Sequence, residues 1–149
     1  MSKLSETISK ILLCTDGSKP SLRAAKRAID IAKRYDAEIL AFYVSIVPPS
    51  VRRAPEYAWK EMHNYDFEQV SKWLKDVIEE TKRDHIDLKI EVKETESSIA
   101  TEIIKKADEN NADLIVIGST GKSRFERLFL GSVAQSVLTY AKCSVLVIR

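Results

Sequence analysis

The sequence has few of the residues that build small metal or redox sites. Its 149 residues include four glycines, four prolines, two histidines and two cysteines. Cys14 and Cys143 stand alone, without C-x-x-C spacing, which argues against a metal or redox motif and indicates a reducing compartment. No apolar stretch is long enough to span a membrane, and the run over 11–14 is too short for a signal peptide. We therefore expect a soluble, cytoplasmic protein without a membrane partner.

An excess of charge of one sign is also lacking. Lys and Arg total 24 and Asp and Glu total 22, for a formal net charge of +2, and the two signs are interspersed. A nucleic-acid-binding surface needs clustered basic residues, so we expect no nucleic acid partner. The composition, 44% hydrophobic and 31% charged, is typical of a globular protein, and the length fits one domain, residues 1–149.

Short apolar runs alternate along the chain with longer amphipathic segments. The first run, 10–15, is of the continuous kind that is buried on both faces of a parallel sheet. Ser18 is then a candidate N-cap, and Pro20 suits a first helical turn. We predict strands over 10–15, 38–44, 88–92, 113–117 and 145–148, and helices over 18–34, 57–83, 99–110 and 132–141. This alternation predicts an α/β three-layer fold, with an open parallel five-stranded sheet and helices on both faces.

The segment between the second and third strands contains a loop and a long helix. Three prolines make 45–55 a loop. The helix over 57–83 carries apolar residues at the helical period, and we expect its aromatic residues to lie in the core rather than in a cofactor site. The apolar positions are Trp59, Met62, Phe67, Val70, Leu74, Val77 and Ile78.

Two loops have the composition of a ligand site. In open parallel sheets, ligands bind beyond the carboxyl ends of the strands, where the strand order reverses. Asp16-Gly17-Ser18 follows the first strand, and a glycine-spaced loop that starts at Gly118 follows the fourth. If the first and fourth strands are neighbours, these loops face each other across one crevice.

The loop from Gly118 to Ser132 combines features of a phosphate site. Gly118 and Gly121 can take positive φ and allow a ligand to approach the backbone. Gly131 and Ser132 precede a helix, where free N–H groups and the positive end of the dipole favour phosphate. The loop also carries the basic residues Lys122, Arg124 and Arg127. On local chemistry alone, these residues are explained equally well as turn glycines and a solvated basic face.

Three common motifs are excluded. Gly121-Lys122-Ser123 is similar to the end of a Walker A loop, but that motif needs glycine at position 116, which is Val116. The dinucleotide fingerprint G-x-G-x-x-G and the nucleophile elbow G-x-S-x-G are also absent. Asp16 has no acidic partner nearby in the sequence, which argues against a phosphoacceptor or a paired general acid and base.

The pattern G-x-x-G, nine residues, then G-S runs from Gly118 to Ser132. In this pattern the sequence resembles the ATP-binding branch of the universal stress protein family. Asp16-Gly17-Ser18 matches the D-x-S turn of that family, and Val44 matches the valine that closes its second strand. The resemblance implies a Rossmann-like fold of the adenine nucleotide alpha hydrolase-like kind, with sheet order 3-2-1-4-5.

The resemblance also implies roles for single residues. It places Asp16 and Val44 beside adenine and ribose, the first two glycines beside ribose and the first phosphates, and Gly131 and Ser132 at the outer phosphates of ATP. Mg²⁺ or Mn²⁺ is the expected companion ion. The predicted nucleotide contacts are Thr15, Asp16, Ser18, Val44, Gly118, Ser119, Gly121, Lys122, Arg124, Gly131, Ser132 and Val133.

The sequence departs from the family pattern at a few positions. Thr120 and Tyr43 stand where histidine is frequent, and Ser144 replaces a proline before the last strand. None of these positions falls on the glycine-serine pattern of the phosphate site.

The last strand indicates an assembly. The apolar run Val145–Ile148 would form an edge of the sheet, and an exposed apolar edge invites pairing with another chain. The family dimerises through this strand, which implies a homodimer, whereas cover by helices or by the N-terminal arm is the alternative.

These observations predict an ATP-binding regulatory protein of the stress response. No residue is a candidate general base for attack on a γ-phosphate, so we expect hydrolysis to be absent or very slow, as in a slow ATPase or an autophosphorylating protein. The alternatives are a true phosphotransferase or nucleotidyl transferase, and an interaction module of the same fold that binds no nucleotide.

Overall fold

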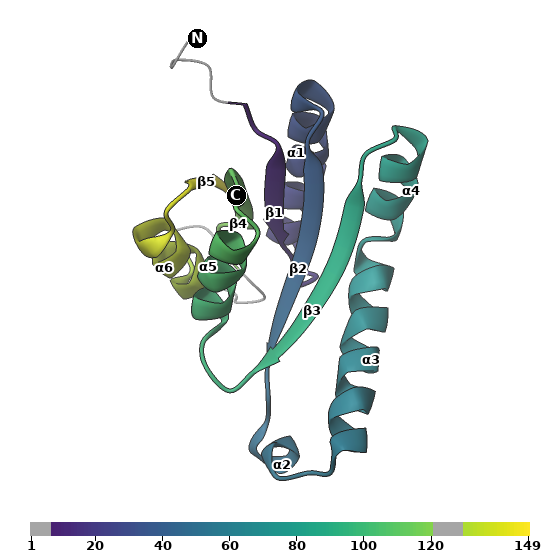
Figure 1. Ribbon diagram of the computed structural model, residues 1–149, viewed down its shortest axis with the longest axis vertical. Helices are drawn as coiled ribbons and strands as arrows, with labels where there is room; N and C mark the ends of the chain where they lie inside the picture. The colour runs from purple at the N-terminus through teal and green to yellow at the C-terminus, as the bar shows by residue number, and fades with distance from the viewer. Residues whose placement is uncertain (1–6, 121–129) are drawn as a thin grey trace.

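A computed structural model of the chain describes residues 7–120 and 130–149. They form one parallel sheet with the strand order β3-β2-β1-β4-β5 (Figure 1). The strands are β1 (Lys10–Cys14), β2 (Glu38–Ile46), β3 (Leu88–Thr95), β4 (Leu114–Gly118) and β5 (Ser144–Ile148). The predicted parallel α/β fold and the sheet order implied by the family resemblance are both confirmed.

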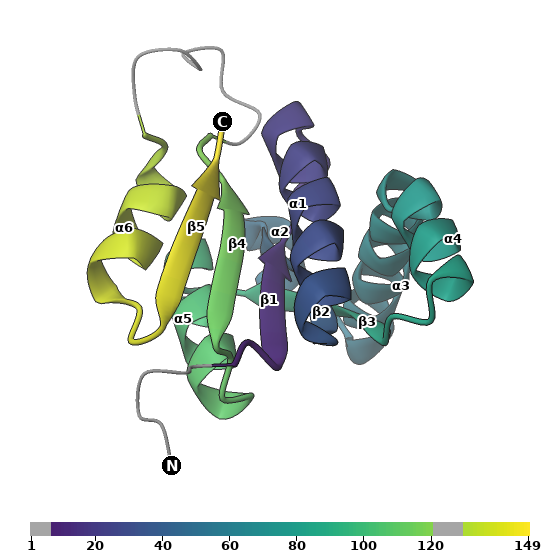
Figure 2. The same ribbon diagram turned by 90° about the horizontal axis from the view of Figure 1, so that it is seen from above.

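Helices cover both faces of the sheet (Figure 2). They are α1 (Lys19–Tyr35), α2 (Pro49–Arg52), α3 (Glu56–Trp73), α4 (Lys75–Arg83), α5 (Ile99–Glu109) and α6 (Ser132–Tyr140). The buried residues of α1, α3 and α4 share one side of the sheet, and those of α5 and α6 share the other. Within residues 7–120 and 130–149, no helix is both long and apolar enough to cross a lipid bilayer.

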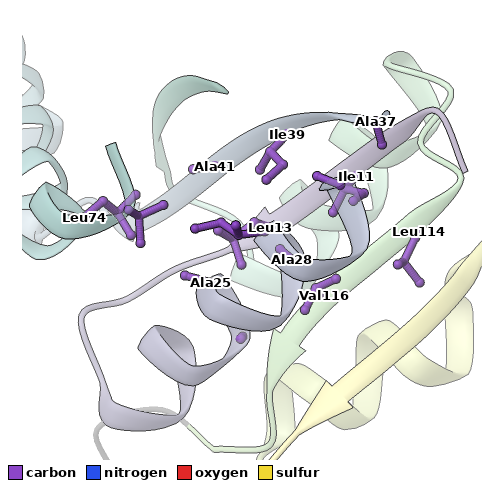
Figure 3. Close-up of a cluster of buried hydrophobic side chains, with 14 of the residues drawn as sticks. Ile11, Leu13, Ala25, Ala28, Ala37, Ile39, Ala41, Leu74, Leu114 and Val116 are labelled. Carbon is purple, nitrogen blue, oxygen red and sulfur yellow. The ribbon is translucent and has the colours of Figure 1, made fainter. Parts of the chain in front are cut away.

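β1 lies at the centre of the core. Ile11 and Leu13 pack on the side covered by α1 (Figure 3), and Leu12 and Cys14 pack on the side covered by α5 and α6. The exposed fraction of each of these residues is 6% or less, as expected for an apolar strand with both faces covered. Burial of each large aliphatic side chain stabilises the fold by about 1.5–3 kcal/mol. The loops at the carboxyl ends of the strands therefore rest on a rigid base.

The prediction of four helices is wrong in the segment between β2 and β3. β2 continues to Ile46 because Ser45 and Ile46 pair with β3, and Pro49–Arg52 forms a short helix inside the predicted loop. The predicted helix over 57–83 is divided at Leu74, which has φ −97° and ψ 14°. Leu74 is nevertheless fully buried. It therefore faces the core at the junction of the two helices, as the helical period predicts.

The inward row of α3 also differs from the predicted apolar stripe. Phe67 is 42% exposed, and Asp66 is buried in its place. Asp66 Oδ2 accepts a hydrogen bond from Ser45 Oγ at 2.7 Å, and His63 Nδ1 lies 3.0 Å from Glu94 Oε1 on β3. The amino half of α3 runs past the ends of β2 and β3 toward α2 (Figure 1).

Candidate functional site

A cavity of about 420 Å³ opens at the carboxyl ends of β1 and β4. These strands are direct neighbours, so the two predicted loops do meet, and the order of the strands reverses between them. Open parallel sheets bind ligands at this position, and the volume falls within the range of small-molecule sites. The lining residues are Cys14, Thr15, Asp16, Ser21, Phe42, Val44, Ile99, Ile103, Ile117, Gly118, Ser119, Thr120, Gly131, Ser132, Val133 and Ala134.

Asp16 is the only carboxylate on this wall among the residues that the structure describes. Its Oδ1 atom accepts a hydrogen bond from the Ser18 backbone N–H at 2.9 Å, which closes the turn after β1. Ser18 itself does not line the cavity. Its hydroxyl caps α1 by accepting the Ser21 N–H at 3.3 Å. Ser18, a predicted nucleotide contact, therefore stabilises the turn that presents Asp16 and caps α1.

Gly17 allows this turn to pack closely against Trp73 of α3. Gly17 has φ 79°, and a Cβ atom placed on it would lie 2.5 Å from Cε2 of Trp73. Trp73 meets the ring of Tyr43 edge-on, with 5.3 Å between the ring centroids. Because a side chain would clash and the left-handed conformation disfavours one, glycine is required at position 17.

Gly118 is required for a reason other than the predicted positive φ. Of the glycines in the described residues, Gly17 alone has positive φ. A Cβ atom on Gly118 would lie 2.9 Å from Pro20 Cβ and 3.0 Å from the Ser21 nitrogen. The missing side chain therefore lets the amino end of α1 approach β4, whereas the sequence suggested that it lets a ligand approach.

α6 begins at the cavity without a side-chain cap. Gly131 is its N-cap residue, and within residues 7–120 and 130–149 the first turn has no side-chain cap hydrogen bond. The Gly131 N–H donates to the Ser119 carbonyl at 2.7 Å, and the Ser119 N–H donates to the Ile148 carbonyl at 2.7 Å, so α6 is tied to the ends of β4 and β5. The free N–H groups and the positive dipole end of α6 favour an anion at the adjacent wall.

Two hydroxyl groups on the wall lack a hydrogen-bond partner. Within the part of the chain that the structure describes, the buried side-chain oxygens without a partner are Thr15 Oγ1 and Thr120 Oγ1. The residues are 5% and 7% exposed, and both line the cavity. Since buried polar groups are nearly always hydrogen-bonded to protein, water or ligand, these two hydroxyls have unused hydrogen-bonding capacity at the wall.

The described residues of the cavity wall include few groups that could act as a nucleophile or a general base. Burial raises the pKa of the Cys14 thiol far above its ordinary value, and the Asp16 charge adds to the shift, so Cys14 is no thiolate nucleophile. No histidine or lysine lines the cavity among the described residues. Over 7–120 and 130–149, no group of three or more His, Cys, Asp or Glu side chains has the arrangement of a metal site.

Most of the predicted contacts that can be located do lie together. Those on the wall are Thr15, Asp16, Val44, Gly118, Ser119, Gly131, Ser132 and Val133. Gly121, Lys122 and Arg124 lie outside the described residues, and so does Arg127.

Sequence reasoning missed the apolar part of the wall. Phe42 precedes Val44 by two residues on β2, so the period of a strand could have placed both on one face. Ile99 and Ile103 come from one face of α5, and the sequence gives no sign that this face reaches the site. Thr120 was set aside because it lies off the glycine-serine pattern, yet it lines the cavity.

The fold and the cavity define a Rossmann-like α/β protein with a ligand site at the switch point of the sheet. A sequence model of the universal stress protein family matches residues 7–149. The chain belongs to the universal stress protein family, as the resemblance in its motifs predicted.

Similar proteins agree with this membership. A universal stress protein of Methanocaldococcus jannaschii is 43% identical over 143 residues, which cover 94% of this chain and 81% of that protein. The structure of a universal stress protein from Lactobacillus plantarum has a TM-score of 0.80 at 24% identity and covers 97% of this chain and 100% of its own.

Two further structures were solved with ligands. A universal stress protein in complex with cAMP has a TM-score of 0.67 at 23% identity, covering 97% of this chain and 98% of its own. One from Archaeoglobus fulgidus in complex with dAMP has a TM-score of 0.63 at 21% identity, covering 95% and 98%. At these identities the likeness shows a shared fold.

Proposed function

We propose that the cavity binds ATP and that the protein acts as a nucleotide-dependent switch in a stress response. One observation carries the proposal: the uncapped amino end of α6 and two unpartnered hydroxyls line one cavity at the switch point of the sheet. Solved relatives of the same fold hold cAMP or dAMP, which, like ATP, contain an adenine, a pentose sugar and a phosphate.

The wall has an apolar part and an anion-attracting part, which suit the two ends of a nucleotide. Phe42, Val44 and Ile103 offer apolar surface to a base, and Asp16 offers a carboxylate that can accept hydrogen bonds from a base or a ribose. Gly131 and Ser132 stand at the start of α6, where phosphate is favoured. Mg²⁺ or Mn²⁺ would be held chiefly by phosphate oxygens, because Asp16 is the one carboxylate on the described wall.

The same wall favours binding over turnover. A hydrolytic enzyme needs a group that takes a proton from water, and efficient general bases have a pKa near the working pH. The described wall has no histidine or lysine, and Asp16 already accepts the Ser18 N–H. We infer that ATP is held with no hydrolysis or with very slow hydrolysis, so that occupancy of the site is the signal.

The test determines which adenine nucleotide copurifies with the protein and whether the protein binds added Mg-ATP. Purified protein is denatured and its supernatant analysed by mass spectrometry for adenine nucleotides, and calorimetry follows the titration of Mg-ATP. Gly131→Arg places a large side chain on the wall and should abolish binding, whereas Lys60→Arg, at an exposed position of α3 away from the wall, is a control that should bind normally. An empty protein that also shows no heat with Mg-ATP would refute the proposal.

We also propose a cytoplasmic homodimer that pairs through β5. β5 is an edge of the sheet, and Val145, Leu146, Val147 and Ile148 are each only partly buried. On the adjacent helix α6, Leu138 is 50% exposed and Tyr140 is 70% exposed, which extends the apolar surface. Sedimentation should give a dimer at micromolar concentration, and Val147→Lys should give a monomer. A monomeric parent protein would contradict this assignment.

A further inference from the structure

The two unpartnered hydroxyls are exceptions in this fold. The buried Thr81 donates from Oγ1 to the Ile78 carbonyl at 2.9 Å, and the buried Thr95 donates to Glu102 Oε1 at 3.0 Å. A buried hydroxyl without a partner destabilises a protein, so the interior normally supplies one. That both exceptions, Thr15 and Thr120, line the same cavity connects the missing partners to a ligand.

Thr120 stands directly beside the start of α6. A Cβ atom on Gly131 would lie 3.2 Å from the Thr120 Cα and 3.0 Å from the Ser119 carbonyl oxygen, so the N-cap of α6 rests on the Thr120 backbone. Thr15, in contrast, follows β1, and its N–H donates to the Phe42 carbonyl on β2. Of the two residues, Thr120 is therefore the one whose backbone lies against the start of α6.

We propose that Thr120 is a specificity-determining residue whose hydroxyl donates a hydrogen bond to a phosphate of the nucleotide held at the start of α6. This inference rests on the proposed function. A phosphate oxygen accepts hydrogen bonds, and the first-turn N–H groups of α6 and the Thr120 O–H are all donors. The ligand thus completes the hydrogen bonding of both.

The proposal predicts opposite effects on stability and on binding. Thr120→Val keeps the shape of the side chain and removes the unpaired hydroxyl. The empty protein should therefore unfold at the same temperature or at a higher one. The affinity for Mg-ATP and for AMP should fall roughly 10- to 100-fold, the range for a lost hydrogen bond to a charged group, while the affinity for adenosine stays unchanged. Thr120→Ser keeps the hydroxyl and should restore phosphate-dependent binding.

Thr81→Val is the matched control. It removes a buried hydroxyl that has a partner and lies off the cavity wall, so it should lower the unfolding temperature and leave every affinity unchanged. The pair of Thr-to-Val variants thus separates a hydroxyl kept for a ligand from one kept for the fold.

Titration calorimetry with Mg-ATP, AMP, adenosine and inorganic phosphate, together with thermal unfolding, decides the question. A parent protein that binds no nucleotide refutes the proposed function and this inference with it. A parent that binds Mg-ATP while Thr120→Val binds it equally well overturns the inference alone. An equal loss for adenosine and AMP, a less stable empty Thr120→Val protein, or inorganic phosphate that binds as tightly as ATP would each overturn it as well.

Discussion

Replacing Gly17 with alanine tests how the turn after β1 is held. Two penalties add. The first is the backbone, since φ is 79° and the left-handed conformation costs an L-residue about 1–2 kcal/mol. The second is the clash of the new methyl group, which would lie 2.5 Å from Cε2 and 2.7 Å from Cδ2 of Trp73; overpacking typically costs about 1–3 kcal/mol. The free energy of unfolding should therefore fall by about 2–5 kcal/mol.

A double-mutant cycle with Trp73→Phe separates these penalties. The smaller ring leaves room for the methyl group, so the two substitutions should couple by about 1–3 kcal/mol, and about 1–2 kcal/mol of backbone penalty should remain. Urea denaturation followed by circular dichroism measures all four proteins without depending on the fluorescence of Trp73. A loss below about 0.5 kcal/mol for Gly17→Ala, or additivity of the two changes within about 0.5 kcal/mol, would refute the reasoning.

Three further predictions concern the packing and the titration of buried groups. Burial, with the Glu94 charge adding, raises the pKa of Asp66 above its ordinary value, against the hydrogen bond from Ser45. Its contribution to stability is therefore full below the ordinary carboxyl pKa near 4 and is lost as pH rises through the raised pKa. Relative to Asp66→Asn, the parent should lose stability in urea denaturation as pH rises above about 4, and a constant difference between the two proteins would contradict this. Burial raises the pKa of Cys14 and, less severely, of Cys143, so iodoacetamide at pH 8 should label Cys143 first and Cys14 only on unfolding, as peptide mass spectrometry can show. Gly118→Ala should lower the unfolding temperature by roughly 2–4 °C per kcal/mol of overpacking, because its Cβ meets Pro20 and Ser21; an unchanged temperature would show that α1 yields without strain.

Much of the fold could be predicted because its signals are local. The apolar run of β1 and the Ser18 cap of α1 depend on residues next to one another in the sequence, and both are found as predicted. Asp66 could not be predicted as an inward residue, because its partner Ser45 comes from another element, 21 positions away. Period alone therefore favoured Phe67, which is left partly exposed.

The candidate site divides in the same way. Asp16 and Ser132 belong to motifs that can be read in short stretches of sequence, and the structure brings them to one cavity. Ile99 and Ile103 contribute to the wall only because α5 packs across the sheet, which a single sequence does not specify. Thr120 was missed for a physical reason: a threonine shows nothing unusual until its burial and the lack of a hydrogen-bond partner are known.

Gly118 and Gly131 each allow a close packing contact in this structure. Gly118 lacks a side chain where α1 begins against β4, and Gly131 lacks one where α6 begins against the end of the same strand. Both helix starts reach the cavity, through Ser21 and Ser132. Since the amino end of a helix attracts negative charge, bringing two such ends to one strand also builds a place for an anion. The glycines thus specify how closely the helices approach, whereas the choice of ligand falls to the groups that this approach assembles, the Asp16 carboxylate and the unpaired hydroxyl of Thr120 among them.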